Sequence, residues 1–118
     1  MKISDETKKI LKDALFLLGI GEDTFEAMAE DATNTNYFID SILDDLQERG
    51  YVSFIRGRKN YEKYLAMNKI EGQTFAIDVG GDVYFMGKVL PEAANEFAAK
   101  LREYFVASGD DEYKVEIL

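Results

Sequence analysis

The stretch ILDDLQERGYV at residues 42–52 decides how the first half of the chain folds. Its isoleucine and two leucines recur at the three- and four-residue spacing of a helix that buries one face. Gly50 is a residue type that ends helices, because glycine adopts the left-handed backbone conformation without strain. The aromatic and β-branched residues that follow favour a strand. The sequence therefore predicts a helix over 37–49 and a strand over 51–55.

Two shorter helical patterns precede this stretch. Residues 5–18 carry an apolar stripe behind Ser4, and residues 24–31 follow Asp23. Serine and aspartate are both favoured N-cap residues, because their side chains accept hydrogen bonds from the first free amides of a helix. The polar run TNTN at 33–36 is typical of a turn. The first part of the chain is thus predicted to contain three helices.

The end of the chain has a β-β-α-β pattern. It is predicted as strands over 74–79 and 82–87 joined by a glycine pair, a helix over 91–107 that begins at a proline, and a strand over 113–117. The stretch between the two parts is interpreted as a hairpin: RGRKN forms the turn, and 61–67 return as its second strand. A short helix over 61–67 fits the sequence as well.

The predicted fold class is α+β. Residues 1–67 form a half with three helices and a β-hairpin, and residues 68–118 form the β-β-α-β half. With only 118 residues, the two halves are expected to pack as one compact unit.

Positive charge is concentrated in the predicted hairpin. The chain carries 23 acidic and 14 basic residues, for a net charge of −9. Residues 51–70 hold five bases and one acid, so 22 acids lie elsewhere. Fields between exposed charges are screened beyond about 8 Å at physiological salt, and a local basic cluster can therefore act independently of the net charge. Such a cluster either protects a sheet edge or binds an anion.

The composition argues against catalysis. The chain has no cysteine and no histidine, which removes thiol and imidazole chemistry, disulfides and zinc fingers. No phosphate loop or nucleophile elbow occurs, and the carboxylates at 110–112 lack the spacing of a calcium-binding loop. We expect no enzymatic activity, no cofactor and no metal. The absence of a long apolar run or signal peptide pattern predicts a cytoplasmic protein with no membrane contact.

The order of the elements over residues 6–67 resembles the winged helix-turn-helix family. The likeness is strongest at 42–52, where a leucine-bearing helix runs through a glycine into a strand, as at the end of a recognition helix and the start of a wing. The resemblance implies a DNA-binding regulator of transcription, whose third helix approaches the major groove while the wing meets phosphates. Carried onto this sequence, it implies DNA contacts from Thr35, Asn36 and Tyr37 at the helix start, and from Arg56, Arg58, Lys59, Tyr61 and Lys63 in the wing.

The third helix departs from this family pattern. It has no basic residue before Arg49, and its carboxylates would repel phosphates. A monomer with about four phosphate contacts would bind DNA modestly, so a homodimer would strengthen the interaction.

A second interpretation treats the acidic residues as the binding surface. The third predicted helix carries a row of carboxylates on its outer side: Asp40, Asp44, Asp45 and Glu48. A small phage-type inhibitor can use such carboxylates to mimic nucleic acid and block a basic, nucleic-acid-handling enzyme of a host. The same carboxylates would also serve solubility alone.

Overall fold

An antiparallel sheet of four strands, in the order β1-β3-β2-β4, lies at the centre of the molecule. The computed structural model describes residues 4–32, 38–70, 74–87, 89 and 91–117. The strands within these ranges are β1 (Ser53–Ile55), β2 (Phe75–Val79), β3 (Asp82–Met86) and β4 (Tyr113–Ile117).

The β2–β3 hairpin is confirmed at the predicted glycine pair. Gly80 and Gly81 both have positive φ, 62° and 100°, which a tight two-residue turn requires and which side chains other than glycine rarely adopt. The amide of Gly81 donates a hydrogen bond to Asp78 Oδ1 at 2.9 Å. The turn sets the register, with Ile77 opposite Tyr84.

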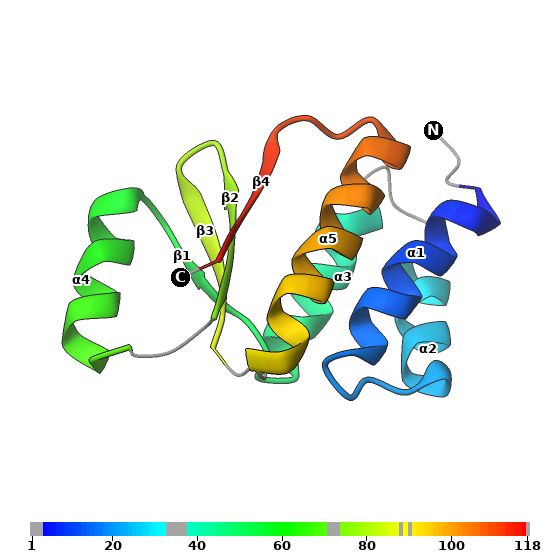
Figure 1. Cartoon of the computed structure of the whole chain (residues 1–118), viewed down its shortest axis with the longest axis horizontal. Coiled ribbons are helices and arrows are strands. Elements are labelled where there is room, and N and C mark those ends of the chain that lie inside the picture. Colours follow the sequence, from blue (N-terminus) through cyan, green and yellow to red (C-terminus); the bar gives the residue numbers. More distant parts are fainter. Residues whose placement is uncertain (1–3, 33–37, 71–73, 88, 90, 118) are drawn as a thin grey trace.

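Both faces of the sheet carry buried apolar side chains, and helices cover both. On one face lie α1 (Asp5–Phe16), α2 (Glu22–Ala32), α3 (Phe38–Glu48) and α5 (Pro91–Ser108), and on the other lies α4 (Arg58–Asn68). Figure 1 shows α4 alone on its side of the sheet; on the other side, α3 and α5 lie next to the sheet and α1 and α2 lie beyond them. Side chains of a strand alternate between faces, and β3 accordingly sends Met86 to the larger helical layer and Phe85 towards α4.

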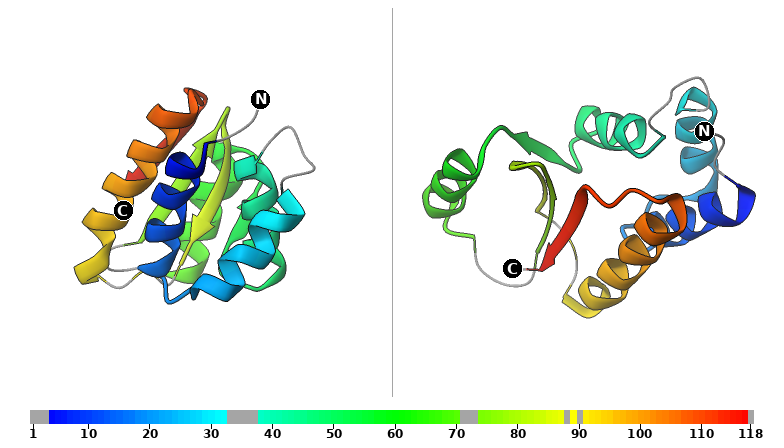
Figure 2. Two further views of the ribbon diagram at one scale, coloured as in Figure 1. Left: turned by 90° about the vertical axis from the view of Figure 1, so that its right-hand side faces the viewer. Right: turned by 90° about the horizontal axis from the view of Figure 1, so that it is seen from above.

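The larger core fills the space between the sheet and its four helices. Its centre is the pair Phe75 and Phe97, both fully buried, whose rings meet edge to face with centroids 4.8 Å apart. Helix α1 packs along α5, and α2 packs along α3. Figure 2 shows α2 and α3 lying side by side. The predicted helices of this layer are confirmed, with ends that differ by at most two residues.

The predicted hairpin wing is wrong. Within the described range 38–70, residues 61–67 belong to α4, and β1 pairs with β3 instead of with a returning strand. Ser53 lies opposite Phe85 and Ile55 opposite Val83. The helix alternative for 61–67 is the one that the structure adopts, and α4 begins within the stretch predicted as the hairpin turn.

The burial pattern of α4 explains this difference. Tyr61 is buried and both Tyr64 and Leu65 are half-buried, which is the three- and four-residue spacing of a helix. Lys63 and Met67, which an alternating strand would place on the same face as Tyr61, are exposed. At the start of α4, Gly57 has a φ of 88° and its amide donates to Asp82 Oδ1 at 3.0 Å. This turn carries the chain across the sheet.

The pairing of β1 with β3 joins the two predicted halves in one sheet. β1 comes from residues 1–67 and the other three strands from residues 68–118. The helix α4 packs on strands of both ranges, because Ile55 of β1 packs against the small buried cluster of Tyr61, Ala76, Val83 and Phe85.

The central role of Phe97 gives a stability prediction. Phe97→Ala would leave a cavity against Phe75, and we expect a loss of about 3–5 kcal/mol in the free energy of unfolding. Met67→Ala, at a side chain that is 82% exposed, should change it by less than about 0.5 kcal/mol. Urea denaturation followed by circular dichroism measures both values. An equal effect of the two substitutions would contradict this placement of the core.

Candidate functional site

The basic residues of the predicted wing lie at α4, and one of them is neutralised. Arg58 Nη1 is 3.1 Å from Asp78 Oδ2 and 3.2 Å from Glu116 Oε1. Burial acts to lower the pKa of Arg58, but its hydrogen bond to Glu116 and the charges of Glu116 and Asp78 outweigh burial and raise it. The guanidinium also lies over the ring of Tyr61, 5.1 Å from its centroid. Arg58 is thus occupied in joining α4 to β2 and β4.

Three other basic residues of this segment face outward. Lys59 and Lys63 are exposed and lie four residues apart on α4, so they share one side of the helix. Arg56 precedes the helix and is also exposed. We call Arg56, Lys59 and Lys63 the α4 basic face. It lies at the end of the molecule farthest from α1 and α2 (Figure 1).

The predicted contact of Tyr61 with DNA is wrong, because this residue is only 1% exposed. It packs beside Phe85, with ring centroids 6.2 Å apart. Burial, aided by the charge of Glu116, raises the pKa of Tyr61 to about 12, and Arg58 opposes this effect. Tyr64 is half-buried and meets Phe85 edge to face at 5.3 Å. Both tyrosines therefore anchor α4 to the sheet.

The residues predicted to approach a DNA groove are Thr35, Asn36 and Tyr37. They lie outside the described residues, and α3 begins at Phe38. The described part of α3 turns its apolar side, including Ile39 and Ile42, into the core. Its outward side is acidic.

The helices α2 and α3 together form the strongest concentration of like charge. They carry nine carboxylates and no lysine or arginine. Of these nine side chains, the exposed ones are Glu22, Asp23, Glu26, Glu30 and Asp31 on α2, and Asp44 and Glu48 on α3. We call these seven residues the acidic helix pair. Because α2 packs along α3, their carboxylates project from one rigid unit.

The four carboxylates predicted on α3 differ in exposure. Asp44 and Glu48 are exposed, whereas Asp40 and Asp45 are half-buried. Asp40 accepts a hydrogen bond from the hydroxyl of Tyr113 on β4. Tyr113 itself stacks on Phe105, with nearly parallel rings and centroids 4.8 Å apart. Asp40 thus ties α3 to β4, and Asp44 and Glu48 are the members of the predicted face that a partner can reach.

The Tyr113 hydroxyl keeps its proton as a result of this arrangement. Burial is the main cause that raises the pKa of this hydroxyl well above its ordinary value, and the hydrogen bond that it donates to Asp40 raises the pKa further. The pKa of the buried Tyr104 is also raised by burial, with the charges of Asp110 and Asp40 adding to the effect. The phenols around Asp40 are therefore neutral and have a structural role.

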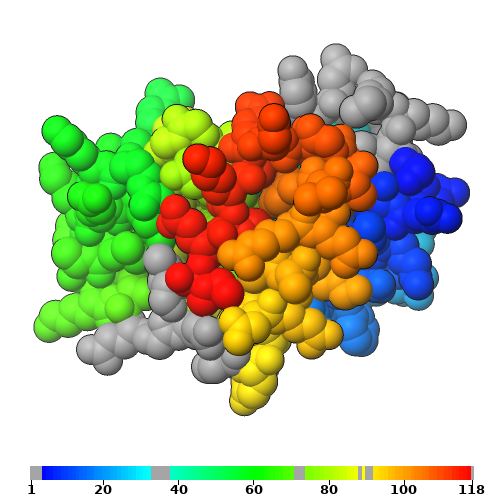
Figure 3. Space-filling view, turned by 45° about the horizontal axis from the view of Figure 1, so that its top comes forward, coloured from blue at the N-terminus to red at the C-terminus, as the bar shows by residue number. Residues whose placement is uncertain are grey.

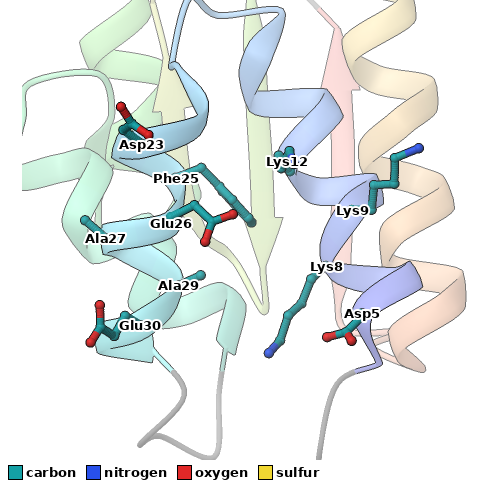
Figure 4. A pocket seen from close by; sticks show the side chains of 10 residues that line it. All are labelled: Asp5, Lys8, Lys9, Lys12, Asp23, Phe25, Glu26, Ala27, Ala29 and Glu30. Carbon is teal, nitrogen blue, oxygen red and sulfur yellow. The ribbon is translucent and has the colours of Figure 1, made fainter.

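A groove of about 750 Å³ between α1 and α2 was not foreseen from the sequence. Figure 4 shows Lys8 extending from α1 towards α2, while Glu26 and Glu30 line the opposite side. Near one end, Lys12 Nζ lies 2.8 Å from Glu22 Oε1. This hydrogen bond raises the pKa of Lys12 and lowers that of Glu22. The lysines of α1 therefore border the acidic helix pair on one side.

The spacing of Lys8, Lys9 and Lys12 is the signal that could have located this groove. Lys8 and Lys12 lie four residues apart and project from the same side of the predicted helix. The sequence did not show that this side would face α2.

Comparisons with protein-family models, with curated proteins and with solved structures gave no match for this chain. In the part of the chain that the structure describes, no group of three acidic side chains is arranged to hold a metal ion. None of the described helices combines the length and apolar character needed to cross a bilayer.

The shifted pKa of Tyr61 predicts a loss of stability at alkaline pH. The phenol ionises at its ordinary pKa of 10.0 in the unfolded chain and at about 12 in the folded chain. The folded state therefore holds the proton longer, and the stability that Tyr61 contributes is lost as the pH rises from 10 to 12. Tyr61→Phe should make the fall in the free energy of unfolding shallower, by up to about 1.4 kcal/mol per pH unit.

Urea titrations between pH 10 and pH 12 measure this slope, and Tyr51→Phe, at a phenol that is 43% exposed, is the matched control. The control should keep the wild-type slope. An unchanged slope in Tyr61→Phe would contradict the burial of this hydroxyl.

Proposed function

We propose that this chain is a non-enzymatic protein-binding module whose acidic helix pair docks onto a basic surface of a nucleic-acid-handling protein. The observation that carries the proposal is the charge of α2 and α3, which hold nine carboxylates and no basic residue. A partner that normally binds phosphates presents lysines and arginines, and a surface of carboxylates complements it. By occupying that surface, the chain would act as an inhibitor.

The positions of the carboxylates support a role beyond helix stability. Glu30 and Asp31 lie in the last turn of α2, and Glu48 lies in the last turn of α3. The C-terminal end of a helix carries partial negative charge, so acids there destabilise the helix by a few tenths of a kcal/mol each. Neither helix has a basic residue in its last turn to compensate. Solubility alone does not require acids at these positions.

The rigidity of the helix pair also supports the proposal. Phe25 and Met28 of α2, together with Ile42 and Leu46 of α3, are buried in the same core. The helices that carry the carboxylates are therefore positioned before a partner arrives, which lowers the entropic cost of binding. A concentrated negative field also steers a basic partner towards this side and speeds association at low salt.

Binding of DNA through the α4 basic face is a second candidate function. Its supporting observation is that Lys59 and Lys63 are exposed on one side of α4, with Arg56 near the start of that helix. A few lysine and arginine contacts with phosphates give weak, salt-sensitive affinity. The net charge of −9 opposes the approach of DNA, which is why we place this candidate second.

The main proposal predicts which carboxylates capture a partner. The full chain is immobilised and exposed to nuclease-treated cell lysate, and bound proteins are identified by mass spectrometry. We expect nucleic-acid-binding proteins that added duplex DNA displaces. Asp44→Asn combined with Glu48→Gln should lower their retention about tenfold, because each lost charge weakens a close ion pair.

The matched control is Glu96→Gln with Glu103→Gln. It removes the same charge from exposed positions on α5 and should retain the partner. An equal loss in both double variants, or capture that DNA does not reduce, would contradict the proposed site.

The second candidate predicts a different result in a titration of fluorescent duplex DNA. If the α4 basic face binds phosphates, Lys59→Ala with Lys63→Ala should reduce the slope of log affinity against log salt by about two. Lys9→Ala with Lys100→Ala, which removes two lysines from other helices, should leave the slope unchanged. The absence of binding at low salt rejects this candidate.

A further inference from the structure

The strand β4 is an edge of the sheet, and a hydrogen bond from Arg102 shows that the carbonyl of Val115 faces outward from this edge. In the strand order β1-β3-β2-β4, β4 pairs with β2 on one side only. Arg102 Nη2 donates to the carbonyl oxygen of Val115 at 3.2 Å, so this carbonyl points away from β2. In an antiparallel strand, the N–H and C=O of one residue point to the same side. The amide of Val115 therefore faces outward too.

The sequence of this edge is complementary to itself. If two copies of β4 pair antiparallel about Val115, residues at equal distances on either side of Val115 lie opposite each other. Lys114 then faces Glu116 of the partner subunit, and Tyr113 faces Ile117 of the partner subunit. Each of these pairs occurs twice, because the arrangement has two-fold symmetry. Opposite charges and large apolar side chains are the pairs that stabilise facing strands.

The geometry of the edge favours this register. Val115 has both backbone groups directed outward and would form a hydrogen-bonded pair with its copy. Lys114 and Glu116 then belong to non-hydrogen-bonded pairs, in which the facing side chains are closest. Lys114 is exposed, and Glu116 is only half-buried although it contacts Arg58. Both charges are therefore accessible to a second chain.

An apolar surface beside β4 also favours this pairing. A groove of about 460 Å³ lies between the end of α5 and β4, lined in part by Phe105, Val106 and Val115. Val106 is 83% exposed. Figure 3 shows β4 at the surface next to α5. A two-fold axis perpendicular to the sheet places both copies of α5 on the same side of the joined sheet, where this apolar surface is shared.

We propose that two copies of this chain associate through β4, by antiparallel pairing centred on Val115, to form a homodimer with one continuous sheet of eight strands. The carbonyl of Val115 has two lone pairs, so it accepts from the partner amide while Arg102 remains in place. The inference is independent of the proposed function, because it uses none of the residues of the acidic helix pair.

Charge reversal at the facing pair tests this interface. Lys114→Glu places acid against acid in both facing pairs, and Glu116→Lys places base against base. Each variant alone should raise the dimer dissociation constant at least about tenfold, as measured by sedimentation equilibrium of the full chain. Mixing the two variants in equal amounts should restore the dimer, since both facing pairs of the mixed dimer then carry opposite charges. Circular dichroism checks that each variant is folded.

A second readout follows the backbone. Hydrogen exchange measured by NMR at low and high protein concentration should show slower exchange of the Val115 amide at high concentration in the wild type. Lys114→Glu should abolish this concentration dependence. The proposal is overturned if the wild type sediments as a monomer at hundreds of micromolar. It is equally overturned if a dimer forms whose stability neither single variant changes, or if the mixture fails to associate.

Discussion

The hydrogen-bonded pairing of β1 with β3 determines where the basic segment after β1 lies. It sets Ser53 opposite Phe85, so the strand that pairs with β1 is the distant β3 and not a local return strand. After Gly57 the chain instead crosses the sheet as α4, buries Tyr61 against Phe85 and brings Arg58 to Glu116. The basic segment consequently lies on one side of the sheet, and the acidic helices α2 and α3 lie on the other (Figure 1). Two surfaces of opposite charge are thereby kept apart in a small protein.

Local signals in the sequence were enough to predict the helices of the larger layer, the β2–β3 hairpin and the last strand. These elements depend on nearby residues, such as the turn glycines Gly80 and Gly81, whose positive φ values are needed wherever the strands go. The partner of β1 could not be predicted in the same way, because strand pairing depends on packing between distant residues. Tyr61 and Leu65 share a face in a helix and in a strand alike, so this pair did not distinguish the two.

The candidate site was predictable in its charge and unpredictable in its accessibility. The row of acids on α3 is plain in the sequence, but the engagement of Asp40 by Tyr113, 73 residues further along the chain, is a tertiary contact. Arg58 and Glu116 are likewise 58 residues apart. Such contacts engage side chains that the sequence predicts to be available to a partner, and the neighbouring residues in the sequence do not indicate this. Asp44 and Glu48 remain available because the helix turns them away from the core.

The most direct test of this account is a set of nuclear Overhauser effects, some between pairs of aromatic rings and some between pairs of backbone protons. The fold predicts contacts of the Phe54 ring with the Tyr84 ring and of the Tyr64 ring with the Phe85 ring, whose centroids are 4.9 and 5.3 Å apart. It also predicts helical contacts between sequential amides along α4. Backbone contacts between residues 53–55 and 61–67, as in a hairpin wing, would contradict the account and return the basic residues to a DNA-binding position.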